Sequence, residues 1–210
     1  MNFTNFRTEI KKNKSVLLFT LIYLIPFTYY FFSTEKGEFI WYSLVVIGLF
    51  ILVLLTISKS KFHSGVIWGL SVWGLLHLAG GSIRAGSDVL YGLVLIPIIN
   101  NGEELIIFKY DQLVHAFGFG LCTYIIFHFL KRYTKNPHTI GVYLIAIFAG
   151  MGLGSLNEIV EFVAVLLFPD NGVGGYVNTS LDLVFNTIGA ILVISFVAIN
   201  YKIKNKKPLN

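Results

Sequence analysis

Imidazole and carboxylate side chains interrupt long apolar stretches of this chain, and these groups bind divalent metal ions or transfer protons. Nitrogen and oxygen ligands suit Zn²⁺, Mn²⁺ or Fe, whereas copper(I) and iron–sulfur clusters favour sulfur. The single cysteine, Cys122, excludes a cysteine-based zinc site. The predicted metal ligands of one shared site are His77, Asp111, His115, Glu158, Glu161 and Asp182, and the predicted supporting amides are Asn157 and Asn186.

Metal-dependent hydrolysis or group transfer is the first chemistry that such a site predicts. A divalent ion would offset the cost of burying several carboxylates and would activate a bound water as a nucleophile. Glu158, His115 and Asp111 are the predicted catalytic residues. Three alternatives stay open: a proton- or ion-coupled transporter, a hydrogen-bonded core that only fixes helix pairing, and a non-catalytic partner of another envelope protein.

The composition indicates an integral membrane protein. Hydrophobic residues make up 55% of the 210 positions, charged residues 13%, and the mean hydropathy is +0.73. Soluble domains carry about 25% charged residues. The net charge of +5 comes from short basic clusters between apolar runs, so it indicates cytoplasmic loops rather than nucleic-acid binding. A charge at the centre of a membrane helix costs about 2.5–3.5 kcal/mol on insertion scales, so several of them are expected to share one site.

Six apolar segments have the length of a membrane span, which needs about 17–25 residues. The chain is therefore expected to be one all-α membrane domain, residues 1–210, with six transmembrane helices. The outer loop 82–110 holds a shorter apolar piece, 89–99, with Pro97, which we expect to be interfacial or re-entrant. The predicted spans are 15–32, 39–57, 65–81, 111–130, 141–168 and 180–201.

The lysines and arginines predict that both termini are cytoplasmic, in a bacterial or archaeal plasma membrane. In this orientation only Lys36, Arg84 and Lys109 lie outside, against thirteen basic residues inside. All the predicted site residues then fall in the outer half of the bilayer, which implies a lipid or lipid-linked substrate from the outer leaflet. The thirteen are Arg7, Lys11, Lys12, Lys14, Lys59, Lys61, Lys131, Arg132, Lys135, Lys202, Lys204, Lys206 and Lys207.

Small residues share helix faces with the ionisable groups. In the fifth span, Gly150, Gly154, Glu158 and Glu161 follow the spacing of one face. Small residues let membrane helices approach closely, so such faces are expected to meet. We therefore predict a four-helix polar core from spans three to six, with the first two spans packed outside it.

Three motifs resemble those of the VanZ-like membrane proteins, and the stretch at 77–81 (HLAGG) is similar to one in the YjdF-type inner-membrane family. The VanZ-like motifs lie at 110–115 (YDQLVH), 157–162 (NEIVEF) and 182–190 (DLVFNTIGA). The resemblance implies a polytopic bacterial inner-membrane protein whose matching positions include Gly189. Glu161 stands where VanZ-like proteins usually have glutamine, and their arginine before the last aspartate is absent. A VanZ-specific function such as glycopeptide resistance is therefore not expected.

Overall fold

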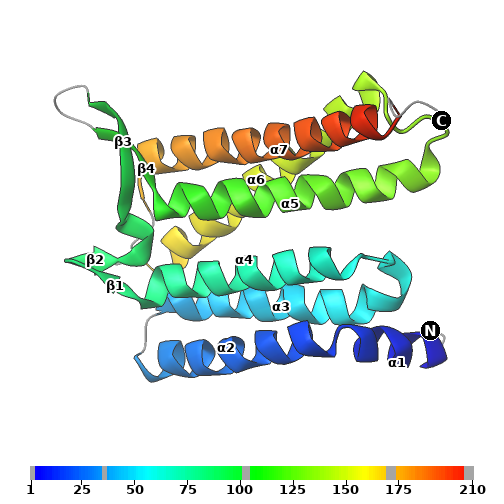
Figure 1. Ribbon diagram of the computed structural model, residues 1–210. Coiled ribbons are helices and arrows are strands. Elements are labelled where there is room, and N and C mark those ends of the chain that lie inside the picture. The colour runs from blue at the N-terminus through cyan, green and yellow to red at the C-terminus, as the bar shows by residue number, and fades with distance from the viewer. Residues whose placement is uncertain (1–2, 35–36, 101–104, 169–173, 206–210) are drawn as a thin grey trace. The chain divides into compact units, whose positions relative to one another are not determined.

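The computed structural model, drawn in Figure 1, describes residues 3–34, 37–100, 105–168 and 174–205. Within these ranges the chain is predominantly helical, so the predicted all-α class is confirmed. Lys36, Lys206 and Lys207 of the predicted charge pattern lie outside the described residues. The helices are α1 Phe3–Lys12, α2 Lys14–Ser33, α3 Gly37–Ser60, α4 Ser64–Ser82, α5 Tyr110–Tyr133, α6 Ile140–Leu167 and α7 Tyr176–Asn205.

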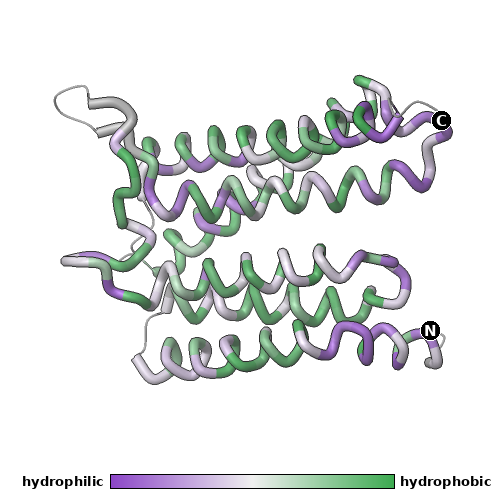
Figure 2. The backbone as a smooth tube through the Cα atoms, viewed as in Figure 1, coloured by the Kyte–Doolittle hydropathy of each residue, from purple (hydrophilic) through white to green (hydrophobic). Residues whose placement is uncertain are grey.

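Five of the described helices are long and apolar enough to cross a membrane: α2, α3, α5, α6 and α7. The third predicted span, 65–81, lies in α4, a helix of 19 residues that is not among these five. At 1.5 Å per residue α4 is about 28 Å long, which is close to the hydrocarbon thickness of a bilayer. Figure 2 shows hydrophobic residues along these helices, with hydrophilic residues gathered at α1 and at helix ends.

Large apolar side chains stand exposed on the long helices, as lipid contact requires. Ile22 and Ile25 of α2, Phe148 of α6 and Phe196 of α7 each expose more than three fifths of their surface. A soluble domain rarely exposes continuous apolar surfaces of this kind. The protein is therefore a multi-pass membrane protein.

The chain divides into two compact units, and the first comprises Met1–Asp111 and Ala164–Asn171. In this unit α2, α3 and α4 run side by side (Figure 1) around a buried cluster that includes Phe31, Phe39 and Leu78. The hydroxyls of Thr20 and Ser71 lie 2.7 Å apart and join α2 to α4. Such a bond satisfies two hydroxyls that lipid cannot hydrate.

The segment 82–110, predicted to be an outer loop, forms two short antiparallel hairpins, which the sequence did not predict. Strand β1 (Arg84–Ala85) pairs with β2 (Asp88–Val89), and the 3₁₀ turn η1 (Leu90–Gly92) follows. Strand β3 (Val94–Asn100) then pairs with β4 (Leu105–Lys109). Much of the segment predicted as interfacial or re-entrant thus becomes β3, because its β-branched residues favour strands and Pro97 disfavours a helix interior. Helix α1 was also not predicted.

The second unit comprises Gln112–Val163 and Gly172–Asn210, which is most of α5 and α6 and all of α7. Glycines bring these helices close together. A Cβ atom on Gly189 would collide with the backbone of Ala116 in α5, and one on Gly150 would collide with the Thr123 side chain. The predicted close packing through small residues is therefore confirmed for these three helices.

Candidate metal centre

His115 of α5 lies between two glutamates of α6. Its Nδ1 is 3.6 Å from Glu158 Oε1, and its Nε2 is 3.7 Å from Glu161 Oε1. All three side chains are largely withdrawn from solvent, with 5% of His115, 9% of Glu158 and 15% of Glu161 exposed. Helix periodicity explains the arrangement, because residues three apart on α6 present their carboxylates to the same neighbour.

The three residues have the geometry to hold a metal ion. One ligand atom from each of His115, Glu158 and Glu161 lies within 4.8 Å of the others. Nitrogen and carboxylate ligands stand about 2.0–2.2 Å from a bound zinc, so two of them are at most about 4.4 Å apart. Side-chain movements of a few tenths of an ångström would therefore close the group around one ion.

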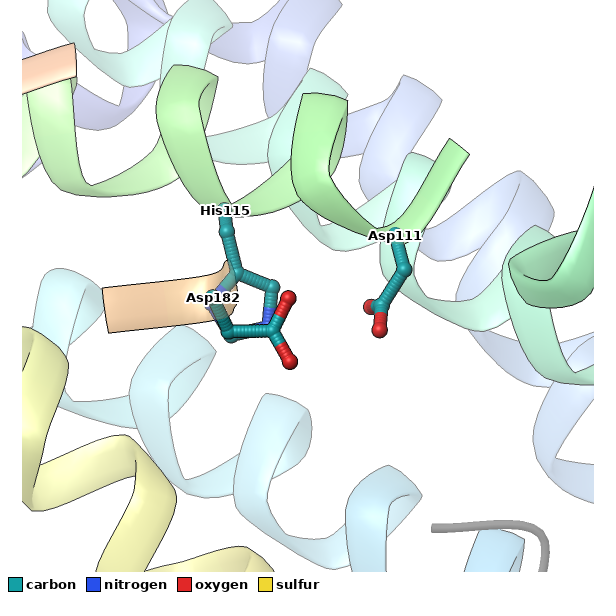
Figure 3. Close-up of side chains that lie close together, drawn as sticks. All are labelled: Asp111, His115 and Asp182. Atoms are coloured by element: carbon teal, nitrogen blue, oxygen red, sulfur yellow. The ribbon is translucent and has the colours of Figure 1, made fainter. Parts of the chain in front are cut away.

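Asp182 of α7 is completely buried and is held by two amides. Gln112 Nε2 donates to Asp182 Oδ1 at 2.7 Å, and Asn178 Nδ2 donates to Oδ2 at 2.7 Å. Both carboxylate oxygens of Asp182 are therefore paired with an amide donor, which fixes the orientation of the carboxylate. Asp182 also lies within 4.8 Å of a His115 ring nitrogen, and Figure 3 shows the two side chains close together.

Two further amides contact the same cluster. Asn157 Nδ2 donates to Glu161 Oε1 at 2.7 Å, and Asn186 Oδ1 lies 3.1 Å from His115 Nδ1. Amides in these positions orient the groups that would bind a metal, as outer-shell partners do in metalloproteins. The arrangement therefore joins ligand-type side chains to a surrounding layer of neutral hydrogen-bond partners.

The helices of the second unit supply little positive charge to this cluster. Their sequence has no lysine or arginine over 112–130, 140–163 or 174–201. Three carboxylates lie close to one imidazole in a largely apolar setting, where a buried charge is costly unless it is paired or binds a metal. A divalent cation fits this donor set.

Asp111 lies in the first turn of α5, one helical turn before His115, and Figure 3 shows both side chains on the same side of that helix. It is the last residue of the first unit. Its position at the N-terminal end of α5 also suits a carboxylate, because the helix dipole is positive there.

His77 of α4 belongs to the first unit, where it contacts aromatic side chains. The Tyr91 hydroxyl lies 2.7 Å from both His77 Nδ1 and the His77 carbonyl oxygen. The Tyr91 ring packs on Gly80, where a Cβ would lie only 2.5–2.8 Å from the ring carbons. The HLAGG stretch thus attaches η1 to α4, and a place for His77 among the metal ligands stays a prediction.

Gln112 and Asn178 are site residues that the sequence reasoning did not select. Asn178 precedes Asp182 by four positions, as Asn157 precedes Glu161. An amide four residues before an acid was the available signal, since these positions face each other on a helix, although Asn178 lies just before the predicted span 180–201. Gln112 pairs with an acid on another helix, so no local spacing identifies it.

Comparison with known proteins supports the membrane assignment and gives no activity. A family model described as "Predicted membrane protein (DUF2238)" matches residues 15–202. An uncharacterised protein of Thermotoga maritima is 31% identical over 117 residues, which are 55% of this chain and 60% of that protein. The chain thus spans about three fifths of that relative's length. No solved structure matches.

The matched range contains the six predicted spans and every residue of the cluster around His115. The match confirms the prediction that the chain belongs to a family of multi-pass membrane proteins with no assigned chemistry. This chain belongs to the DUF2238 family of predicted membrane proteins.

Proposed function

We propose that the protein is a metal-dependent membrane hydrolase or transferase that acts on a lipid or lipid-linked substrate at the outer leaflet. His115, Glu158 and Glu161 would hold Zn²⁺, Mn²⁺ or Fe, with Asp182 as a fixed negative charge beside them. The observation that carries the proposal is the position of His115 between two glutamates of α6, within the stretches 112–130 and 140–163 that contain no lysine or arginine.

The outer-leaflet location depends on a topology of six spans with both termini in the cytoplasm. The connection from α3 to α4 is three residues long, and α4 packs beside both α2 and α3. A helix of this length that runs back along a membrane-spanning neighbour is itself expected to cross. The excess of lysine and arginine in the predicted inner segments supports the orientation.

The proposed chemistry divides between the ion and the protein. A bound ion would lower the pKa of a coordinated water to about 7, which supplies a nucleophile at neutral pH. His115 and Glu158 orient this centre, and Asp111, one turn earlier on α5, is the proposed acceptor of the water proton. The motifs shared with VanZ-like and YjdF-type proteins support a common site in these families.

Metal content tests the proposal directly. Wild-type protein purified in detergent should bind close to one Zn²⁺, Mn²⁺ or Fe ion per chain by elemental analysis. His115→Ala and Glu158→Gln should lose it, whereas Asp88→Asn, in the outer loop, should retain it. Absence of metal in the wild type after each ion has been added would contradict the proposal.

Turnover separates the enzyme from a transporter. Metal-loaded protein in nanodiscs should convert a component of an extracted bacterial lipid mixture, detected by mass spectrometry, and Glu158→Gln should not. In sealed liposomes, pH-driven solute or ion flux without lipid conversion would instead favour a proton- or ion-coupled transporter.

A further inference from the structure

The contact between Asn186 and His115 favours a proton on one particular ring nitrogen. His115 Nδ1 lies 3.1 Å from Asn186 Oδ1, and an amide oxygen can only accept a hydrogen bond. With the amide in this orientation, the contact is a hydrogen bond only when Nδ1 carries the proton, which leaves the lone pair of a neutral ring on Nε2. That nitrogen faces Glu161 at 3.7 Å.

Asn186 is enclosed so tightly that its side chain has little freedom. Only 1% of it is exposed. A Cβ atom on Gly154 of α6 would lie 3.0 Å from Asn186 Cβ, 2.9 Å from its Cγ and 2.6 Å from its Nδ2. One turn later, Gly189 packs on the backbone of Ala116. The amide is thus held against α6 while its oxygen reaches α5.

Burying an asparagine at this position costs free energy, and packing alone does not explain why an asparagine is there. Asn186 Nδ2 is buried and has no hydrogen-bond partner among the described residues. Leaving a buried donor unsatisfied costs about 1–3 kcal/mol, and leucine, which branches at the same atom as asparagine, has no polar group to bury. An asparagine here therefore requires a reason, and its contact with His115 supplies one.

We infer that Asn186 is a positioning residue that fixes His115 as the Nδ1-protonated tautomer and so presents Nε2 to the metal. The inference rests on the proposed function and deepens it, because it selects one of the two ring nitrogens as the ligand. Metal-binding histidines commonly donate their other ring N–H to an oxygen acceptor, which fixes both tautomer and ring orientation.

Nitrogen NMR of metal-free protein labelled with ¹⁵N-histidine reads the tautomer directly. The chain has five histidines, and the resonances of His115 are those that are missing from the spectrum of His115→Ala. Wild-type His115 should show a protonated Nδ1 and an unprotonated Nε2, and added Zn²⁺ should shift the Nε2 resonance. Asn186→Asp keeps an oxygen acceptor and should keep the tautomer.

Asn186→Leu should give a mixture of tautomers and weaken Zn²⁺ binding about 10–100-fold. Asn157→Leu is the matched control, because it removes an amide that contacts Glu161 and should leave the His115 tautomer unchanged. A loss of folding in Asn186→Leu does not affect the test, since the wild-type spectrum and Asn186→Asp already decide it.

The two proposals fail in different ways. A protonated Nε2 in the metal-free wild type would overturn the role of Asn186, even if the protein binds a metal. A protonated Nδ1 in a protein that binds no metal would support the positioning by Asn186 and overturn the proposed function.

Discussion

At the scale of residues, three of the buried ionisable groups are each matched by an uncharged hydrogen-bond partner. Asp182, Glu161 and His115 all have an amide within hydrogen-bond distance. In lipid such partners have no substitute, because no water is present to replace them. The amides should therefore contribute to stability as well as to the geometry of the site.

Gln112→Leu tests that contribution. It removes the donor to Asp182 Oδ1 and should lower the free energy of unfolding by about 1–3 kcal/mol, since Asp182 is fully buried. Reversible unfolding in mixed micelles measures the change. The control is Ser155→Ala, whose exposed hydroxyl bonds only within its own helix, to the Met151 carbonyl. Equal stability of the two variants would contradict a structural role for Gln112.

His138, in the connection between α5 and α6, predicts a pH dependence of stability. Burial, and then the charge of Lys131, lower the pKa of His138 below its ordinary 6.5. Its ring stacks on Tyr201 at 3.7 Å, and its Nδ1 lies 2.9 Å from the Tyr143 hydroxyl. As pH falls below 6.5, His138 is protonated in the unfolded chain before it is protonated in the folded protein. The stability that the neutral, folded-state ring contributes is therefore full above pH 6.5 and is lost as the pH falls toward the folded-state pKa.

His138→Phe keeps the stacking and removes the titration. The loss of stability between about pH 7.5 and pH 5.5, the interval that brackets the ordinary histidine pKa, should therefore be smaller in this variant than in the wild type. Thermal unfolding at both pH values measures it. The same loss in both proteins would show that His138 does not contribute.

At the scale of elements, the sequence predicted helices well and the partners of their side chains less well. A period of 3.6 residues defines which residues share a face, so Gly154, Glu158 and Glu161 could be aligned on α6 without a structure. Periodicity does not say which face of another helix lies opposite, which is why Gln112 was missed. The two hairpins between α4 and α5 were missed because a short apolar run fits a strand or a helix equally well.

Gly189→Ala tests the close contact between α5 and α7. The added methyl group would collide with the Ala116 backbone, so the helices must separate, and both stability and metal binding should fall. Gly152→Ala is the matched control, because nothing lies within 4 Å of its Cβ position. Since alanine favours a helix over glycine by about 1 kcal/mol, the control should be neutral or stabilising. A neutral Gly189→Ala would show that the contact is looser than described.

At the scale of the whole molecule, the location of the site depends on the direction in which the helices cross. Helix α4 is decisive, because it is not among the five helices that qualify by length and composition. If α4 crosses, Lys59 at the end of α3 and Arg84 in β1 lie on opposite sides of the membrane. If α4 does not cross, they lie on the same side, and the predicted depth of the site is wrong.

Single cysteines at these two positions decide the topology. In a Cys122→Ala background, Arg84→Cys should react with a membrane-impermeant maleimide in intact cells, and Lys59→Cys should react only after permeabilisation. Lys204→Cys, near the end of α7, should behave like Lys59→Cys, because both termini are predicted to be cytoplasmic. Both native side chains, Lys59 and Arg84, are exposed, so access within the fold does not limit labelling. Labelling of both Lys59→Cys and Arg84→Cys in intact cells would show that α4 does not cross, and labelling of Lys59→Cys alone would show the opposite orientation. Either result would remove the argument for an outer-leaflet substrate.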